Sequence, residues 1–444
     1  MVTGKKLVGF FTQKQTWRLQ PATLGLITFF LVNSILINLA LEAAHQQNSL
    51  RYLKKYLVQT ALEDSWMPIR EGMQFSETYP NKLLYSEIWF NRNIKFQYPP
   101  TSMLLLEPLR HSRWGDLTSD AWLNRISWMM VIAIAGLNGV IFSTGMRKNS
   151  DSATVSHLDK ATWLLLPIFF TLTFYPLLRG YTLGQIQTWI DFIFAVLVLT
   201  WLKNRQGISG VMGGLICAIK PQLGLLLVWS LLRKQWRFVI GFTITILLAA
   251  LISLAAYGWQ NHLDYLRLLS FISQHGESYY PNQSVNGLLN RLFFNGSNLL
   301  WEQDQFAPYN PWVAGGTWLT SATLILGALF WQRNNYHATD VLDLSLATLS
   351  FTIASPVAWE HHYGILLTIF AVVAPVAIEH KKKHPAWLIL VAAAFLLVSN
   401  LYLFMNQFAL TSANILQSYL FFGAIILLAV LYRISYCLRY KPET

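Results

Sequence analysis

Long apolar blocks dominate the sequence, and their length restricts the fold more than any other feature. Each block is close to the length of about 20 residues that a helix needs to cross a bilayer. The blocks lie at about 21–43, 121–143, 161–178, 186–202, 238–257, 312–331, 341–357, 363–379, 385–404 and 414–432. They predict an all-α fold, that of a polytopic integral membrane protein with about ten full spans.

Composition argues against the main alternatives to this fold. Only 12% of the 444 residues are charged, which is about half of the fraction found in an ordinary soluble domain. The alternating pattern of an outer-membrane barrel does not occur in the sequence. There is no repeat, linker composition or second soluble region, so residues 1–444 are expected to form a single membrane-embedded domain with helical external loops.

Short basic links between the blocks predict the orientation in the membrane, because lysine and arginine are enriched in cytoplasmic loops. The links are "MRK" at 146–148, "KNR" at 203–205, "RKQWR" at 233–237 and "HKKKH" at 380–384. If these links and both termini are cytoplasmic, the long polar segments 45–120 and 258–311 lie outside. We therefore expect a multi-pass membrane protein with these two polar segments on the extracytoplasmic side.

Residues 208–232 do not fit this topology as a simple span. One crossing would place "KNR" and "RKQWR" on opposite sides of the membrane. A re-entrant helical hairpin avoids this conflict. Its two half-membrane helices would meet at Lys220-Pro221, where proline removes a backbone donor and bends the chain.

The net charge of +12 does not indicate a nucleic-acid site, because the basic residues gather in the short links, where they fix topology and meet lipid headgroups. Membrane lipids, and no nucleic acid, are the expected partners. Cys217 lies in an apolar run and Cys437 in the basic tail, so a structural disulfide between them is not expected.

A set of polar residues falls on the external side of this topology or points toward it. The set comprises Asp64, Gln185, Lys220, Asn282, Gln283, Arg291, His361 and His362. One shared external site is the simplest explanation for this distribution.

Lys220 carries the strongest constraint within this set. A lysine near mid-membrane costs about 2.5–3.5 kcal/mol on insertion scales, so its ammonium should face a polar cavity or an anionic partner. A phosphate would be such a partner. The structural alternative is that Lys220 snorkels to an interface or pairs with Asp191.

Asp64 and the histidines are the candidates for proton transfer. Asp64 lies in "LEDSWMPIREGMQF", which has the pattern of an external amphipathic helix, and a carboxylate there would serve as a general base. The alternative is that Asp64 or Glu63 is simply a solvated charge. His361 and His362 point to different faces of a helix, so one of them would accept a proton or bind phosphate, unless both only cap the span.

The segment "YYPNQSVNGLLNRL" supplies further binding groups. The amides of Asn282 and Gln283 are suited to sugar hydroxyls, and the guanidinium of Arg291 is suited to a phosphate. The sequence has no Asp-x-Asp pair, no spaced His/Cys cluster and no Gly-rich phosphate loop. A nucleotide-sugar enzyme that holds a diphosphate through a metal is therefore disfavoured, and neither a metal nor a cofactor is expected.

Five motifs, in this order and spacing, resemble those of family 87 glycosyltransferases. They are "FQYPP", "YTLGQIQTWIDFIFAVL", "GGLICAIKPQLGLLLVWSLLRKQWR", "YYPNQSVNGLLNRL" and "SPVAWEHHYG". The resemblance runs from about Asp64 to His362. It implies the C-type glycosyltransferase fold and sugar transfer, with mannose favoured, from a polyprenyl-phosphate donor to a lipid-linked or polysaccharide acceptor. The active site would be extracytoplasmic, at the outer face of the inner (plasma) membrane. The transfer would proceed with inversion and without a metal.

The resemblance also implies roles for single residues. Asp64 matches the aspartate that acts as the base, although "DSWMPIR" replaces the usual tyrosine-containing pattern after it, so Glu63 stays open as an alternative. The motif histidine (His361 or His362), Lys220 and Arg291 would surround the donor phosphate. Gln185, Asn282 and Gln283 would line the sugar and acceptor region.

Two other functions are compatible with the same features. A lipid or sugar transporter or flippase would also have a broken helix and a buried lysine, but transporters usually carry paired broken helices in two related halves, and the sequence indicates one. A polysaccharide polymerase with a diphospho-lipid donor would require more arginine at the site than the sequence places there.

Overall fold

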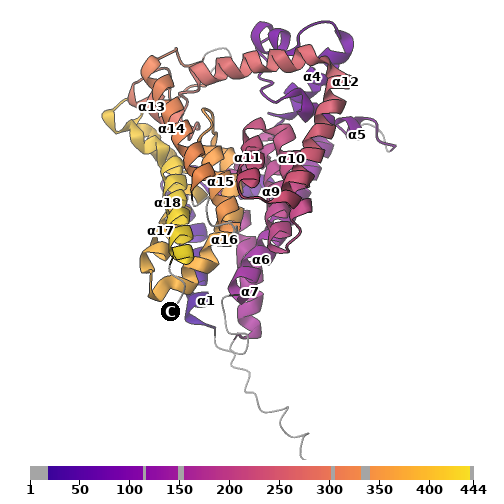
Figure 1. Ribbon diagram of the computed structural model, residues 1–444. Coiled ribbons are helices and arrows are strands. Elements are labelled where there is room, and N and C mark those ends of the chain that lie inside the picture. The colour runs from indigo at the N-terminus through magenta and orange to yellow at the C-terminus, as the bar shows by residue number, and fades with distance from the viewer. Residues whose placement is uncertain (1–18, 114–116, 149–154, 302–305, 332–340, 441–444) are drawn as a thin grey trace, which may run out of the picture.

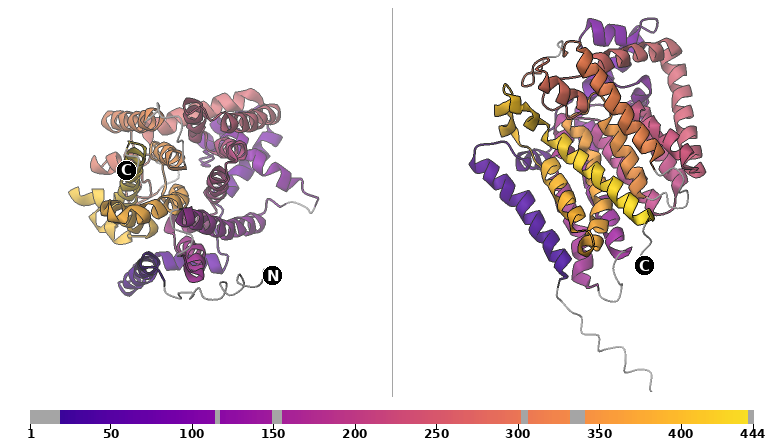
Figure 2. Two further views of the ribbon diagram at one scale, coloured as in Figure 1. Left: turned by 60° about the horizontal axis from the view of Figure 1, so that its bottom comes forward. Right: turned by 60° about the vertical axis from the view of Figure 1, so that its left-hand side comes forward.

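The computed structural model describes residues 19–113, 117–148, 155–301, 306–331 and 341–440, which form helices and connecting loops without a β-strand (Figure 1). The terminal segments, which were expected in the cytoplasm, fall partly outside these residues. The start of the first described helix and the end of the last lie at the same end of the helical bundle (Figures 1 and 2).

Within the described residues, six helical segments are long and apolar enough to cross a membrane. They are Pro21–Ala43, which begins with α1 (Pro21–Phe30), Asp120–Arg147 in α6 (Asp120–Lys148), Trp236–His275 (α12), Pro311–Phe330 (α14), Glu360–Lys382 around α16 (Leu366–Glu379), and Ser412–Leu438, which contains most of α18 (Tyr419–Tyr440). The bent pair α7 (His157–Leu172) and α8 (Tyr175–Leu183), with 50° between its halves, would be a seventh. The protein is thus a polytopic helical membrane protein, but the expected count of about ten spans is not confirmed.

The remaining predicted spans correspond to shorter helices. The apolar ones are α9 (Gln187–Leu202), α10 (Gln206–Ile219), α11 (Leu225–Leu232, preceded by a 3-10 turn from Pro221), α15 (Val341–Ile353) and α17 (Pro385–Ser399). Helices of this length do not cover the roughly 30 Å of a hydrocarbon core alone. Several of them end inside the apolar blocks, at polar turns that other parts of the chain stabilise.

Residues 206–232 form the helical hairpin that the basic links predicted. The backbone leaves the helix at Lys220 (φ −125°, ψ 91°), and α11 then returns toward the end at which α10 began. Consequently α10 and α12 run in the same direction: Gly207 contacts Gly241, and Gly214 contacts Thr245 further along both helices. The approach is so close that a Cβ at Gly210 would lie 2.1 Å from the carbonyl oxygen of Phe238.

A buried ion pair ties the end of this hairpin to two other helices. Arg233 Nε donates to Asp343 Oδ2 at 2.8 Å, and both side chains are 1% exposed. The guanidinium also donates to the carbonyl oxygens of Leu329 and Trp331 at the end of α14. Because nearly every donor of the guanidinium has a partner, the charge is tolerated in the interior.

A cap of short helices lies at the end of the bundle opposite the start of α1 and the end of α18 (Figure 1). It includes α3 (Ser49–Leu57), α4 (Trp66–Thr78), α5 (Glu107–Arg110) and α13 (Val285–Leu292). The second half of α12 lies across this end, because the helix bends at Gly258, whose φ of 74° favours glycine (Figure 1).

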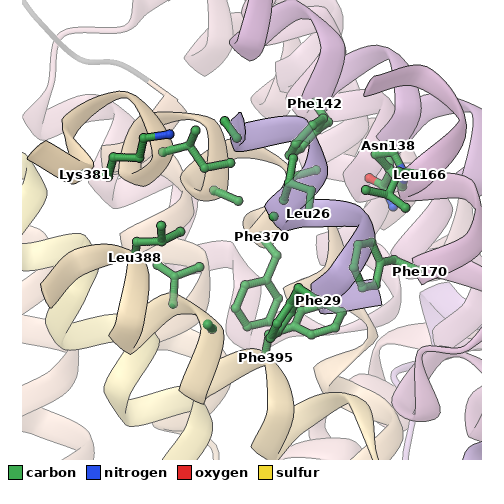
Figure 3. A pocket seen from close by; sticks show the side chains of 18 of the residues that line it. Leu26, Phe29, Asn138, Phe142, Leu166, Phe170, Phe370, Lys381, Leu388 and Phe395 are labelled. Atoms are coloured by element: carbon green, nitrogen blue, oxygen red, sulfur yellow. The ribbon is translucent and has the colours of Figure 1, made fainter. Parts of the chain in front are cut away.

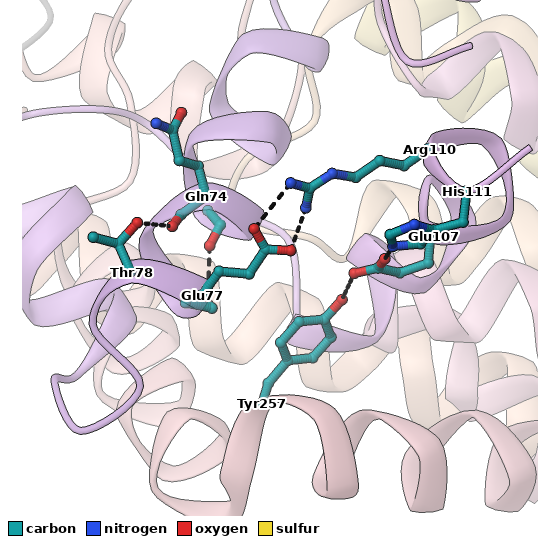
Figure 4. Close-up of polar contacts among 9 residues, drawn as sticks. Gln74, Glu77, Thr78, Glu107, Arg110, His111 and Tyr257 are labelled. Atoms are coloured by element: carbon teal, nitrogen blue, oxygen red, sulfur yellow. Dashed lines mark hydrogen bonds and ion pairs between the residues drawn. The ribbon is translucent and has the colours of Figure 1, made fainter. Parts of the chain in front are cut away.

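Polar contacts hold α5 against its neighbours in the cap (Figure 4). Arg110 forms a two-pronged ion pair with Glu77 of α4, and the Tyr257 hydroxyl of α12 donates to Glu107 at 2.9 Å. Glu107 also lies 3.5 Å from His111. Exposed pairs of this kind contribute at most about 1 kcal/mol each, so they orient the cap more than they stabilise it.

Candidate active site

Two neighbouring cavities lie between the bundle and its cap. The first, here the acid cavity, has a volume of about 470 Å³ and is lined by Asp64, Arg179, Glu277 and His361 among others. The second, the lysine cavity, has a volume of about 410 Å³ and is lined by Lys220 and His362 together with mostly apolar residues. The two cavities share Gln97, Tyr98, Ile272 and Val357, so they are adjacent.

Asp64 is held in place by the turn that follows α8. The Leu62 and Asp64 amides donate to the carbonyl oxygens of Thr182 and Leu183, at 3.0 and 2.9 Å. Gly184 closes this turn at a φ of 68°, and a Cβ there would lie 1.9 Å from the Leu62 carbonyl oxygen. Only glycine permits this approach, so the turn fixes where the carboxyl group sits.

Gln185 orients the carboxylate of Asp64. Its Nε2 donates to Asp64 Oδ2 at 2.5 Å, while its Oε1 accepts from Ser65 Oγ at 2.7 Å and from the Tyr98 hydroxyl at 3.1 Å. Burial raises the pKa of Asp64, and the Gln185 hydrogen bond and the positive charges of Arg179 and Lys95 offset part of this rise.

Glu63, the alternative to Asp64, has a different environment. Its carboxylate accepts from Arg70 at 2.8 Å, and its side chain is 51% exposed. Arg70 is shared with Asp120 at 2.6 Å. A solvated carboxylate that is already paired is a weaker candidate for a base than the buried Asp64.

The two histidines face different cavities. They lie in the 3-10 turn Glu360–Ile365, with ring centroids 4.7 Å apart and planes 89° apart. His361 lines the acid cavity and His362 lines the lysine cavity. Both side chains are buried, and each cavity is lined by one imidazole.

Lys220 stands at the tip of the hairpin and is 8% exposed. Its Nζ donates to Gln187 Oε1, and Gln187 Nε2 donates in turn to Asp191 Oδ1 at 2.7 Å. The amide of Gln187 therefore stands between the ammonium and the carboxylate, and Lys220 still reaches the lysine cavity.

Arg291, Asn282 and Gln283 lie behind the cavity walls and are not among the lining residues. Arg291 donates to the Asn282 carbonyl oxygen at 3.0 Å and to Ser418 Oγ at 2.7 Å, and burial lowers its pKa to about 9. Asn282 Oδ1 accepts from the Ala358 amide at 3.0 Å, and Gln283 Nε2 donates to the Gln417 carbonyl oxygen at 2.8 Å. The Asn282 contact joins segment 279–292 to the turn that precedes the histidines, and the contacts to Ser418 and Gln417 join it to the turn before α18.

The structure adds polar lining residues that the sequence did not single out. Arg179 lines the acid cavity with its guanidinium 5.6 Å from the Tyr52 ring, and Lys95 lies 4.5 Å from the Trp301 ring. Burial raises the pKa of Glu277, another acid that lines this cavity. Arg179 is the first residue of the segment "RGYTLGQ", which ends at Gln185. Its closeness to Gln185 in the sequence could have indicated that it belongs to the site.

Among the described residues, no group of three or more His, Cys, Asp or Glu side chains is arranged to hold a metal ion. The acid cavity combines the carboxylates of Asp64 and Glu277 with the cations Arg179 and Lys95, and the lysine cavity adds the Lys220 ammonium. This arrangement can remove a proton in one compartment and stabilise a negative charge in the other.

Fold and site together define a class: a polytopic membrane protein with a polar site between its helical bundle and a cap of short helices. Comparison with known proteins then identifies the family. Residues 96–356, more than half of the chain, match the model of Glycosyltransferase family 87, and the protein belongs to that family. The matched region contains Gln185, Lys220 and the 279–292 segment but neither Asp64 nor the histidines.

One relative is the polyprenol-phosphate-mannose-dependent alpha-(1-2)-phosphatidylinositol mannoside mannosyltransferase of Mycobacterium tuberculosis. It is 25% identical over 294 residues, which are 63% of this chain. The chain spans 62% of the length of that relative.

Proposed function

We propose that this protein transfers a sugar, mannose in the first instance, from a polyprenyl-phosphate donor to a lipid-linked or polysaccharide acceptor. The observation that carries the proposal is the pair of adjacent cavities, one with Asp64 and the other with Lys220. Membership of the family supports sugar transfer. The relative is named as a polyprenol-phosphate-mannose-dependent phosphatidylinositol mannoside mannosyltransferase, which supports a polyprenyl-phosphate donor and a lipid-linked acceptor.

One displacement step uses both cavities. Asp64 accepts the proton of the acceptor hydroxyl while the hydroxyl oxygen forms a bond to the anomeric carbon. The bond between that carbon and the donor phosphate oxygen breaks, and the phosphate leaves with the electron pair. Lys220 and His362 stabilise the charge that develops on it. Because base and leaving group act from opposite sides, the configuration inverts, and the step needs no metal.

We assign supporting roles to the other expected residues. Gln185 holds the Asp64 carboxylate, and His361 lies on the acid-cavity side of the same turn as His362. Arg291, Asn282 and Gln283 have their polar groups engaged with backbone and neighbouring side chains. Their proposed role is to hold the histidine turn in place, rather than to contact the phosphate and sugar directly as expected from the sequence.

We propose an inner-membrane protein with cytoplasmic termini and an extracytoplasmic active site. The basic links support this orientation, since the positive-inside rule places them in the cytoplasm. Elements that line the cavities, α4 and the second half of α12 among them, lie at the end of the bundle opposite the start of α1 and the end of α18 (Figure 1).

The bend between α7 and α8 is a second broken helix, a feature that the transporter alternative requires. One assay separates the two functions. Purified protein in vesicles would receive labelled polyprenyl-phosphate mannose or polyprenyl-phosphate arabinose together with extracted membrane lipids as acceptors. Label from the mannose donor is expected to appear in acceptor lipid. Movement of intact donor across the bilayer without transfer would instead support a transporter.

A further inference from the structure

An apolar groove that shares no lining residue with the two cavities lies among α1, α6, α7, α16 and α17 (Figure 3). Its volume is about 350 Å³, and almost all of the residues that line it are apolar. It begins beside Pro21 and Lys381 and continues inward past Leu26 and Phe29.

Phenylalanine rings close the inner end of the groove. The Phe395 ring centroid lies 5.9 Å from that of Phe29 and 5.0 Å from those of Phe170 and Phe370. Lys381 and Leu367 both line the groove, and the helical rise between them corresponds to about 20 Å. The groove is therefore longer than half of the roughly 30 Å thickness of a hydrocarbon core. This length suits a single extended acyl chain.

A positive charge stands at the outer end. Lys381 is partly buried and has no carboxylate in ion-pair contact within the described part of the chain. It belongs to the "HKKKH" link, whose other lysines, Lys382 and Lys383, are exposed. An anionic headgroup is the complement of this charge, and each basic residue near a membrane surface attracts anionic lipid with about 1 kcal/mol.

We propose that this groove is a binding site for an anionic phospholipid of the leaflet that the "HKKKH" link faces. One acyl chain fills the groove as far as the phenylalanine rings, and the phosphate pairs with Lys381. The occupant would bridge α1, whose surface is largely exposed to lipid, and the core helices α16 and α17. This site does not depend on the proposed sugar transfer.

The test uses the full-length protein reconstituted in an equal mixture of phosphatidylcholine and phosphatidylglycerol. After extraction into detergent, native mass spectrometry measures the lipid that stays bound. The wild type is expected to retain phosphatidylglycerol, and Lys381→Gln should lower this retention about fivefold. Lys382→Gln is the matched control, because that lysine belongs to the same link but does not line the groove.

A second pair of variants tests the groove itself. Ala374→Phe fills it and is expected to lower retention, whereas Ala386→Phe, at an exposed position of α17 outside the groove, is not. Equal losses in the two lysine variants would overturn the proposal, as would unchanged retention in Ala374→Phe. Recovery of a prenyl phosphate in place of phosphatidylglycerol would overturn the assignment of the occupant.

Discussion

Asp64 has an environment that suits a general base in a buried site. Its carboxylate lines the acid cavity and is held by one side-chain amide, and Glu277 lines the same cavity. Burial raises the pKa of Asp64, which brings a carboxylate closer to the basicity that proton abstraction near neutral pH requires. Glu63, one residue earlier, also lines the cavity, but its side chain is largely exposed and Arg70 pairs with its carboxylate.

Replacement of Asp64 by asparagine should therefore remove transfer while leaving the site formed. We expect the turnover of Asp64→Asn to fall by about 10²- to 10⁴-fold, the usual contribution of a general base. Donor affinity should change little, because Lys220 and His362 lie in the neighbouring cavity. Glu63→Gln is the control and should retain most of the activity. Near-normal turnover of purified Asp64→Asn would remove this residue from the mechanism.

The hydrogen bond from Gln185 gives a test by pH. The bond stabilises the ionised form of Asp64, so Gln185→Leu should raise the pKa of Asp64 further. Since the base must be ionised, the acid limb of the pH profile of kcat/KM should move to higher pH. Tyr98→Phe removes a contact to Gln185 Oε1 but keeps the bond to Asp64, so its shift should be smaller. A limb that moves to lower pH would contradict this assignment.

Lys220 is expected to stabilise the negative charge that develops on the leaving phosphate. We expect Lys220→Ala to lower kcat by about 10²- to 10³-fold, as loss of one donor to a developing charge usually does. Lys220→Arg keeps the positive charge and should recover part of the rate. Gln222→Ala changes a neighbour that lines the same cavity and should be close to wild type. Equal kcat values for the wild type, Lys220→Ala and Lys220→Arg would reduce the lysine to a structural role.

At the scale of helices and turns, hydropathy locates the apolar blocks but not the points at which their helices end. The six long spans could be predicted because the apolar character of a block is a local property. The end of α15 at Ile353 could not be predicted in this way. Asn282 donates to the carbonyl oxygen of Pro356 in the turn that follows α15, and these two residues are 74 positions apart in the sequence. Contacts between distant segments decide such ends.

The turn at Gly184 makes a prediction at this scale. A Cβ at Gly184 would collide with the Leu62 carbonyl oxygen, and the positive φ adds backbone strain. We expect Gly184→Ala to lower the free energy of unfolding by about 1–3 kcal/mol and to reduce transfer by displacing Asp64. Gly136→Ala in α6, where nothing lies within 4 Å of the added Cβ, is the control. Its stability, measured by thermal unfolding, should change by less than about 1 kcal/mol.

At the scale of the whole molecule, the sequence predicted that distant polar residues share one end of the bundle, and the structure divides them into two groups. Asp64, Gln185, Lys220 and the histidines line the cavities, while Arg291 and its neighbours lie behind them. Residue type alone could not separate these groups. Arg291 was assigned by its charge, but which partners reach its guanidinium depends on how α13 packs against the turn before α18.

The direction of the chain through the membrane is the last property of the whole molecule to be tested, and the hairpin makes the test specific. If α10 and α11 turn back at Lys220, the links on either side of them face the same compartment. In a background with Cys217 and Cys437 replaced by serine, single cysteines at the exposed positions Lys203, Lys234 and Lys382 should resist a membrane-impermeant thiol reagent in intact cells. A cysteine at Lys82, in the cap at the other end of the bundle, should react, and permeabilised cells provide the control for reactivity. Labelling of only one of positions 203 and 234 would mean that residues 208–232 cross the membrane, and the hairpin could not present Lys220 to the external site.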